Sequence, residues 1–175
     1  MAGKLINKKA LLLTYAFPPL QASESFLNVK AFSKIKSFDI DILTIDASEI
    51  GYALDYSLDR YVSENFNKVI KVKPPKWINS NVFRFLRYVP GFPDRFRFFN
   101  NVLYKKAKEM EIQKYDLVIS WSTWHSIHLV ASRIKKNNPS IPWLAHLSDP
   151  WADNPFLQRF VGYASSCLLY TSPSP

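Results

Sequence analysis

Short apolar segments recur along this chain and constrain its fold more than any other feature. The run at 10–15 is typical of a strand that is buried on both faces of a parallel sheet. Between such runs, apolar residues follow helical spacing, as within 127–134. Alternating strands and helices predict an α/β fold, in which a parallel sheet carries helices on both faces. The predicted strands are 10–15, 39–45, 68–72, 115–120 and 142–147, and two of the predicted helices are 23–37 and one that begins near Asp94.

Size and composition are those of one globular domain. The chain has 175 residues, of which 47% are hydrophobic, enough for a sizeable core. Its net charge of +9 favours anionic partners such as a membrane surface, nucleic acid or a phosphorylated substrate. No apolar run approaches the roughly 20 residues that a membrane-spanning helix needs, and no signal peptide is predicted.

The segment around Asp149 is the first candidate site. A predicted buried strand, 142–147, ends abruptly at Ser148-Asp149-Pro150-Trp151, because Pro150 cannot donate to a strand ladder. An acid and a tryptophan then lie at the carboxyl end of a strand, which is the edge where open α/β sheets bind ligands. The alternative is a capped turn with a packing tryptophan.

Two motifs resemble the N-terminal domain of family 4 glycosyltransferases, enzymes with two Rossmann-like domains (the GT-B fold) that use nucleotide sugars. Pro142-Trp-Leu-Ala-His-Leu-Ser-Asp-Pro-Trp151 is similar to the last strand and loop of that domain. Lys8-Lys-Ala-Leu-Leu-Leu-Thr-Tyr-Ala-Phe-Pro-Pro19 is similar to its first strand and loop. The resemblance covers roughly residues 8–160 and implies a three-layer Rossmann-like fold. Family members often have a histidine before the acid, where this chain has Ser148, so no histidine role is carried over.

The resemblance also implies which residues form the site. Asp149 is expected to orient or deprotonate an acceptor hydroxyl. The family's glycine-rich loop is here Leu20-Gln-Ala-Ser23, which lacks glycine and puts a close backbone approach to the ligand in doubt; Ser23 is a candidate cap for the next helix. The remaining expected acceptor-binding residues are Pro19, Gln21, Ala22, Ser23, Ser122, Thr123, Trp124, His125 and Trp151.

The expected activity is sugar transfer to a glycan or lipid-linked acceptor, in bacterial polysaccharide biosynthesis. This half is expected to bind no cofactor, because the missing C-terminal domain would hold the UDP- or GDP-sugar donor. The chain alone is therefore expected to be inactive. The resemblance implies a cytoplasmic enzyme, peripheral on the inner face of the membrane.

The stretch 82–108 is the second informative region. It holds seven Arg or Lys and eight Phe or Tyr, against the single acid Asp94. One interpretation is a core-packing helix with a solvated basic face. The other is a surface for anionic lipid, formed by Arg84, Arg87, Arg95, Arg97 and Lys105. A non-enzymatic module that binds membrane or nucleic acid is the alternative function. The matched motifs lie at strand ends rather than in this stretch, so no nucleic-acid partner is predicted.

Other chemistry is sparse. His125 and His128 are spaced i, i+3 but lack further ligands, so no metal site is predicted. His128 is expected at the surface and His146 in the core. Residues 167–175 resemble the translation of a transposase-library sequencing adapter. The expected organisation is a domain at 1–166, a non-native tail at 167–175 and an absent donor-binding domain.

Overall fold

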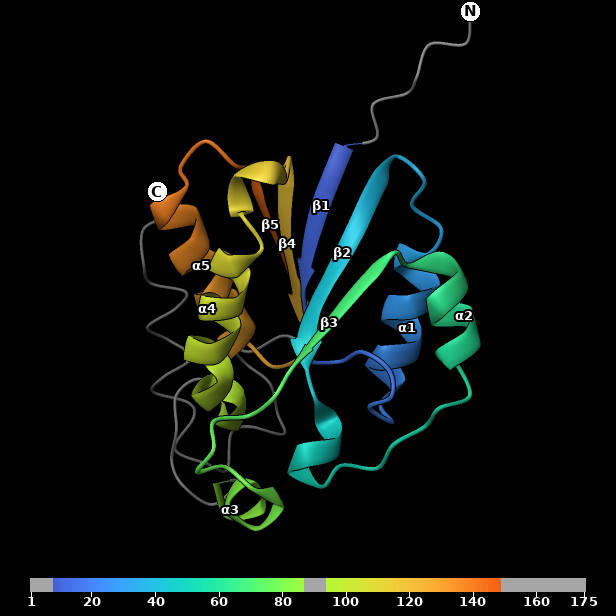
Figure 1. Cartoon of the computed structure of the whole chain (residues 1–175), viewed down its shortest axis with the longest axis vertical. Helices are drawn as coiled ribbons and strands as arrows, with labels where there is room; N and C mark the ends of the chain where they lie inside the picture. The colour runs from blue at the N-terminus through green and yellow to red at the C-terminus, as the bar shows by residue number, and fades with distance from the viewer. Residues whose placement is uncertain (1–7, 87–93, 149–175) are drawn as a thin grey trace, which may run out of the picture.

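A five-stranded parallel sheet forms the centre of the protein. The computed structural model describes residues 8–86 and 94–148, and within them the strand order is β3-β2-β1-β4-β5. Every neighbouring pair of these strands is parallel, including β1 with β4. Helices α4 and α5 cover one face, and α1 and α2 cover the other (Figure 1). The predicted α/β fold, a parallel sheet with helices on both faces, is therefore confirmed.

The strands match the predicted segments to within two residues at each end. The region 47–66, to which the sequence analysis assigned no element, holds a 3₁₀ turn, η1, and the short helix α2. The strands are β1 (Lys8–Leu13), β2 (Phe38–Ile45), β3 (Lys68–Val72), β4 (Leu117–Ser122) and β5 (Trp143–Leu147). The helices are α1 (Ser23–Phe32), α2 (Asp59–Asn65), α3 (Ser80–Leu86), α4 (Asn100–Glu109) and α5 (Ser126–Asn137), with 3₁₀ turns η1 (Ala47–Ile50), η2 (Arg95–Phe99) and η3 (Ile112–Lys114).

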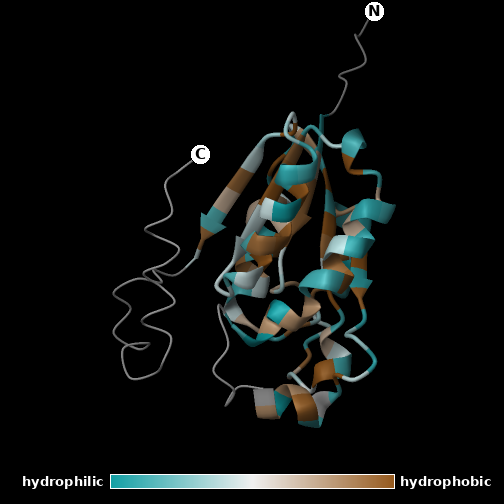
Figure 2. Cartoon of the chain, turned by 90° about the vertical axis from the view of Figure 1, so that its left-hand side faces the viewer, coloured by the Kyte–Doolittle hydropathy of each residue, from teal (hydrophilic) through white to brown (hydrophobic). Residues whose placement is uncertain are grey.

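Strand β1 divides its side chains between two hydrophobic cores. Leu11 and Leu13 pack in the core beneath α4 and α5, whereas Ala10 and Leu12 pack in the core beneath α1. This follows from the pleat, which points successive side chains to opposite faces. A strand that is buried on both faces must be apolar throughout. The apolar run at 10–15 therefore indicated that this strand lies in the middle of the sheet. Figure 2 shows the brown, apolar strands inside and the teal, polar surfaces of helices outside.

The basic-aromatic stretch supplies the larger core. Asp94 begins the turn η2 by accepting a hydrogen bond from the Phe96 amide at 2.8 Å, and α4 follows at Asn100. The sequence predicts a buried helical face formed by Phe96, Phe99, Val102, Leu103, Ala107 and Met110. All of these residues are buried except Val102, which is partly buried against the same core. Full burial of a side chain such as Leu103 contributes about 1.5–3 kcal/mol.

Several expectations are corrected. Strand β5 was expected to be buried, but it lies at the sheet edge, where Leu144 and Leu147 are half exposed. An apolar run does not distinguish an edge strand from a central one, because topology decides that position. Helix α1 ends at Phe32 rather than at 37, which leaves Ile35 outside it and exposed. Ser23 does not cap α1, since the capping position is Ala22.

Candidate functional site

The carboxyl ends of the parallel strands meet at one edge of the sheet, at the lower end of Figure 1. The loop after β1, the loop after β4 and the end of β5 all lie there. These are the three places where the sequence predicted acceptor-binding residues. Asp149, Trp151 and Arg87 lie outside the described residues.

The loop after β1 is fixed by buried hydrogen bonds. Asn28, which is fully buried on α1, donates to the Thr14 hydroxyl at 3.2 Å and to the Ala16 carbonyl at 2.8 Å. Further along, the Gln21 amide donates to the Ala53 carbonyl at 2.9 Å. The peptide bond between Pro18 and Pro19 is cis.

The expected acceptor residues of this loop differ in their exposure. Pro19 is buried, Gln21 and Ser23 are exposed, and Ala22 is partly buried. The amides of Gln21 and Ala22 donate to carbonyls of the protein itself. These two backbone donors are therefore not available to a ligand. The parts of this loop that a ligand could contact are the exposed side chains of Gln21 and Ser23.

Glu24 connects all three loops, and sequence reasoning missed it. Its carboxylate is buried at the start of α1 and accepts hydrogen bonds from the Thr123 amide at 2.9 and 3.1 Å and from the Thr123 hydroxyl at 2.9 Å. The Ser148 hydroxyl donates to the same carboxylate at 2.5 Å. Glu24 thus holds the loop after β4 and the residue before Asp149 against the first turn of α1. The one available signal was an acid in the first turn of a helix, where it is stabilised by the helix dipole.

The loop after β4 sends its side chains in two directions. Thr123 faces Glu24, whereas the Trp124 ring packs on Phe96 on the other side, with 4.4 Å between centroids. The Ser122 hydroxyl is fully buried and accepts from the Trp124 amide at 3.1 Å. His125 is buried at the capping position of α5. Thr123 is therefore the residue of this loop that the structure brings to the α1 side of the site.

A buried polar cluster supports the same loop from beneath. Asp94 accepts from both the amide and the hydroxyl of Ser126 at 2.8 Å, so it holds the start of α5 as well as η2. The Ser126 hydroxyl is also 3.1 Å from the Tyr15 hydroxyl, which donates to Asn100 at 2.7 Å. Burial raises the pKa of the Asp94 carboxyl, although its hydrogen bonds oppose that shift. Burial likewise raises the pKa of Tyr15. These side chains hydrogen-bond to one another and to the backbone, which fits a structural role.

His128 is partly buried, which corrects the expectation that it lies at the surface. Its Nδ1 atom is 2.8 Å from the Ser120 hydroxyl, which also accepts from the Trp143 indole at 2.8 Å. Burial, with a smaller contribution from the neighbouring His125 and His146, lowers the pKa of His128 to about 4. Ser120 is fully buried within β4, so this serine-histidine pair is not accessible for nucleophilic catalysis.

His146 lies on the edge strand, not deep in the core. Its ring stacks on Trp121 with 3.4 Å between ring centroids. The Nδ1 atom of His146 is buried and has no hydrogen-bond partner among the residues described.

The basic residues of the 82–108 stretch lie in different environments. Arg84 and Lys105 are exposed, and the Arg97 guanidinium lies over the Phe98 ring at 4.8 Å. Arg95 is partly buried, and its guanidinium lies over the Phe83 ring at 4.6 Å. The four of these basic residues that the structure describes therefore do not form one uniform surface. Arg84 and Arg95 instead line a cavity of about 340 Å³ near η1.

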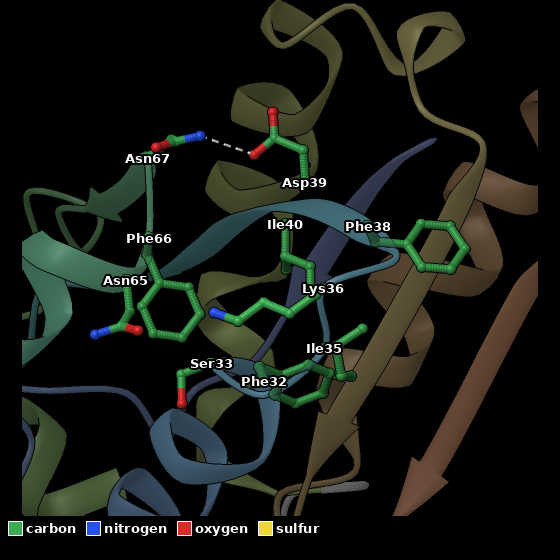
Figure 3. A pocket seen from close by; sticks show the side chains of 10 residues that line it. All are labelled: Phe32, Ser33, Ile35, Lys36, Phe38, Asp39, Ile40, Asn65, Phe66 and Asn67. Atoms are coloured by element: carbon green, nitrogen blue, oxygen red, sulfur yellow. Dashed lines mark hydrogen bonds between the residues drawn. The ribbon is translucent and has the colours of Figure 1, made fainter. Parts of the chain in front are cut away.

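A second cavity, of about 240 Å³, lies at the opposite edge of the sheet (Figure 3). It is formed by the end of α1, the start of β2 and the end of α2, and Asn67 donates to Asp39 at its rim at 3.1 Å. None of the expected acceptor-binding residues lines it. This cavity is therefore separate from the candidate site.

Within 8–86 and 94–148, no group of three or more His, Cys, Asp or Glu side chains is placed to hold a metal ion. No helix in those ranges has the length and apolarity to cross a membrane. Comparisons with protein-family models, curated proteins and solved structures gave no match.

Proposed function

We propose that this chain is the acceptor-side domain of a glycosyltransferase with two Rossmann-like domains. The observation that carries the proposal is the Glu24 cluster, in which one buried carboxylate gathers the start of α1, Thr123 and Ser148 at the carboxyl edge of a parallel sheet. Ligand sites in open α/β sheets lie at that edge. The two motifs that resemble family 4 glycosyltransferases end at the same edge, which adds support.

In this proposal Asp149 acts on the acceptor. The Ser148 hydroxyl is fixed by Glu24, so the backbone that leads into Asp149 is anchored on one side. Asp149 would accept a proton from the acceptor hydroxyl, or orient it, as that oxygen attacks the donor sugar. Exposed Gln21 and Ser23 would contact acceptor hydroxyls from the loop after β1.

The donor belongs to the other half of the proposed enzyme. The chain has four glycines and no Gly-x-Gly-x-x-Gly motif, so a self-sufficient nucleotide site is not expected here. A UDP- or GDP-sugar would bind mainly to a C-terminal domain encoded downstream. The DNA beyond codon 166 tests this directly, since the proposal requires a second Rossmann-like domain there.

The catalytic test replaces Asp149 with Asn in the complete two-domain enzyme. A general base contributes about 10²–10⁴-fold to turnover, whereas a lost turn cap costs roughly 1 kcal/mol of stability. We expect Asp149→Asn to lower sugar transfer at least about a hundredfold with little change in melting temperature. Unchanged transfer per folded molecule would show that Asp149 is only a turn residue.

Glu24→Gln tests the positioning role of the cluster. The amide keeps the size of the side chain but replaces one acceptor oxygen with a donor, which conflicts with the Thr123 amide and hydroxyl. We expect reduced transfer and a lower melting temperature together, because the cluster holds structure as well as the site. Arg60→Gln, on exposed α2, is the matched control and should change neither.

A second candidate function is binding to an anionic membrane surface, and the surface around α3 favours it. Trp77 is 55% exposed and Phe85 is 65% exposed. Exposed Lys76 and Arg84 lie beside them in sequence. Exposed aromatic and basic side chains are the combination that membrane interfaces bind. The two functions are compatible, since an enzyme that acts on a lipid-linked acceptor works at a membrane.

A further inference from the structure

A cavity lies beyond the carboxyl end of β2, between η1, η2 and α3. Its volume is about 340 Å³, at the lower end of the range of roughly 300–1,000 Å³ for small-molecule sites. The Glu24 cluster does not line it. Its lining includes Gly51, Tyr52, Asn81, Phe83, Arg84 and Arg95.

Arg95 brings a positive charge into the wall of this cavity. Its guanidinium lies over the rings of Phe83 at 4.6 Å and Tyr52 at 5.2 Å, and it donates to the Tyr52 hydroxyl. A guanidinium has five N–H donors, and a neutral phenol satisfies only a small part of that capacity. The aromatic rings fix the plane of the guanidinium, which prepares its remaining donors for a ligand.

The carboxylates nearby are already engaged. Both carboxylate oxygens of Asp94 accept hydrogen bonds, from the Phe96 amide and from the amide and hydroxyl of Ser126. Glu49, on η1, pairs with Lys73 at 3.3 Å. The charges of Asp94 and Arg95 interact, but within 8–86 and 94–148 no carboxylate forms a direct ion pair with Arg95 or Arg84. Among the described residues that line the cavity, two carry a positive charge and none is an acid.

Arg84 and Gly51 complete the site. Arg84 is exposed at α3, and its guanidinium donates to the Asn81 side chain at 3.0 Å, which holds it beside the cavity. Gly51 has a φ of 71°, a left-handed conformation that glycine adopts without strain. It has no side chain, so the cavity wall there is backbone that a ligand can approach closely.

We propose that this cavity binds the phosphate group of a phosphorylated small molecule or lipid headgroup. Two guanidinium groups, one of them held flat by aromatic rings, match the planar, bidentate geometry that phosphate oxygens accept. The surrounding rings of Tyr52 and Phe83 would contact the carbon part of the ligand. The proposal stands on the cavity alone and does not require that the chain transfers sugar.

Calorimetric titration of the full chain with inorganic phosphate and with glycerol 3-phosphate tests the proposal. We expect both to bind, and Arg84→Gln to weaken binding by about tenfold, the effect of losing one charge-assisted contact. Arg84 is exposed, so this variant should fold as the wild type does. Arg60→Gln, which makes the same charge change on α2, is the control and should leave binding unchanged. Arg95→Lys keeps the charge but not the planar fork, and should also weaken binding.

Vesicles separate the two sources of phosphate. Binding of glycerol 3-phosphate that depends on Arg84 indicates a soluble ligand. Arg84-dependent binding only to vesicles with phosphatidic acid, and not to phosphatidylcholine vesicles, indicates a lipid headgroup. Either outcome supports the phosphate site. An equal loss of binding in Arg84→Gln and Arg60→Gln would overturn it, because binding would then depend only on the net positive charge of the protein. So would failure of every probe to bind at about 10 mM.

Discussion

Acidification should destabilise this protein through His128. The pKa of this imidazole is lowered from its ordinary 6.5 to about 4 by burial and by the neighbouring His125 and His146. Between these two pH values the unfolded chain binds a proton that the folded chain does not. His128 therefore contributes stability that is fully present above pH 6.5 and is lost as pH falls toward 4.

The size of the effect follows from the two pKa values. Lowering the pH from 7 to 5 should reduce the free energy of unfolding by about 2 kcal/mol through this one group. That is a large part of the roughly 5–15 kcal/mol that stabilises a typical domain. Asp94 acts in the opposite direction. The pKa of its carboxyl is raised by burial, so protonation on acidification favours the folded state.

Comparison with His128→Asn isolates the histidine. Asn keeps an acceptor near the position of Nδ1 for the Ser120 hydroxyl but does not titrate. Urea unfolding at pH 7, 6 and 5 should lower the wild-type midpoint by about 1 M more than that of the variant. The contribution of Asp94 is common to both and cancels. An NMR titration that places the His128 pKa near 6.5, or equal pH slopes in the two proteins, would refute the reasoning.

Other predictions concern the loop after β1, the membrane surface and the tail. Asn28→Ala should cost about 1–3 kcal/mol in urea unfolding, because it leaves the buried Ala16 carbonyl without that donor; a smaller loss would mean that water replaces the amide. Changing Arg84 and Arg97 together to Glu should reduce sedimentation with anionic vesicles, since each basic residue contributes on the order of 1 kcal/mol; equal binding of wild type to neutral vesicles would contradict this. An independent clone made without the adapter should lack residues 167–175, and their presence there would show that they are native.

The sheet was predictable because its signals are local. A strand that is buried on both faces must be apolar at every position. The run at 10–15 has this pattern, so its burial could be predicted from these residues alone. The parallel arrangement followed from the helices between the strands. The edge position of β5 was not predictable in this way. Its sequence is as apolar as a central strand, and only the strand order places Leu144 at the rim.

The candidate site was partly predictable, for a different reason. Strand ends pointed to loops that the structure brings together, but the residue that joins them, Glu24, was missed. Glu24 interacts with Thr123 and Ser148, which are 99 and 124 positions away in sequence. The residues next to Glu24 in sequence do not indicate such distant partners, and an acid in the first turn of a helix is common. Trp124 shows the reverse case, because a loop residue expected at the site packs instead against Phe96.

The basic-aromatic stretch shows how one composition divides between core, cavity and surface. Phe96 and Phe99 are buried because α4 must cover the sheet, whereas Phe85 stays exposed on α3. Arg95 lies over aromatic rings because Tyr52, 43 positions earlier, provides both a ring and a hydroxyl. The Arg95 guanidinium interacts with the charge of Asp94 but forms no direct ion pair with a carboxylate of the described chain. It therefore keeps N–H donors for the anionic ligand that we propose. Arg84, in the same stretch, lies exposed on α3, where a hydrogen bond of 3.0 Å to Asn81 holds it. The phosphate site that we propose would therefore combine one partly buried guanidinium and one exposed guanidinium.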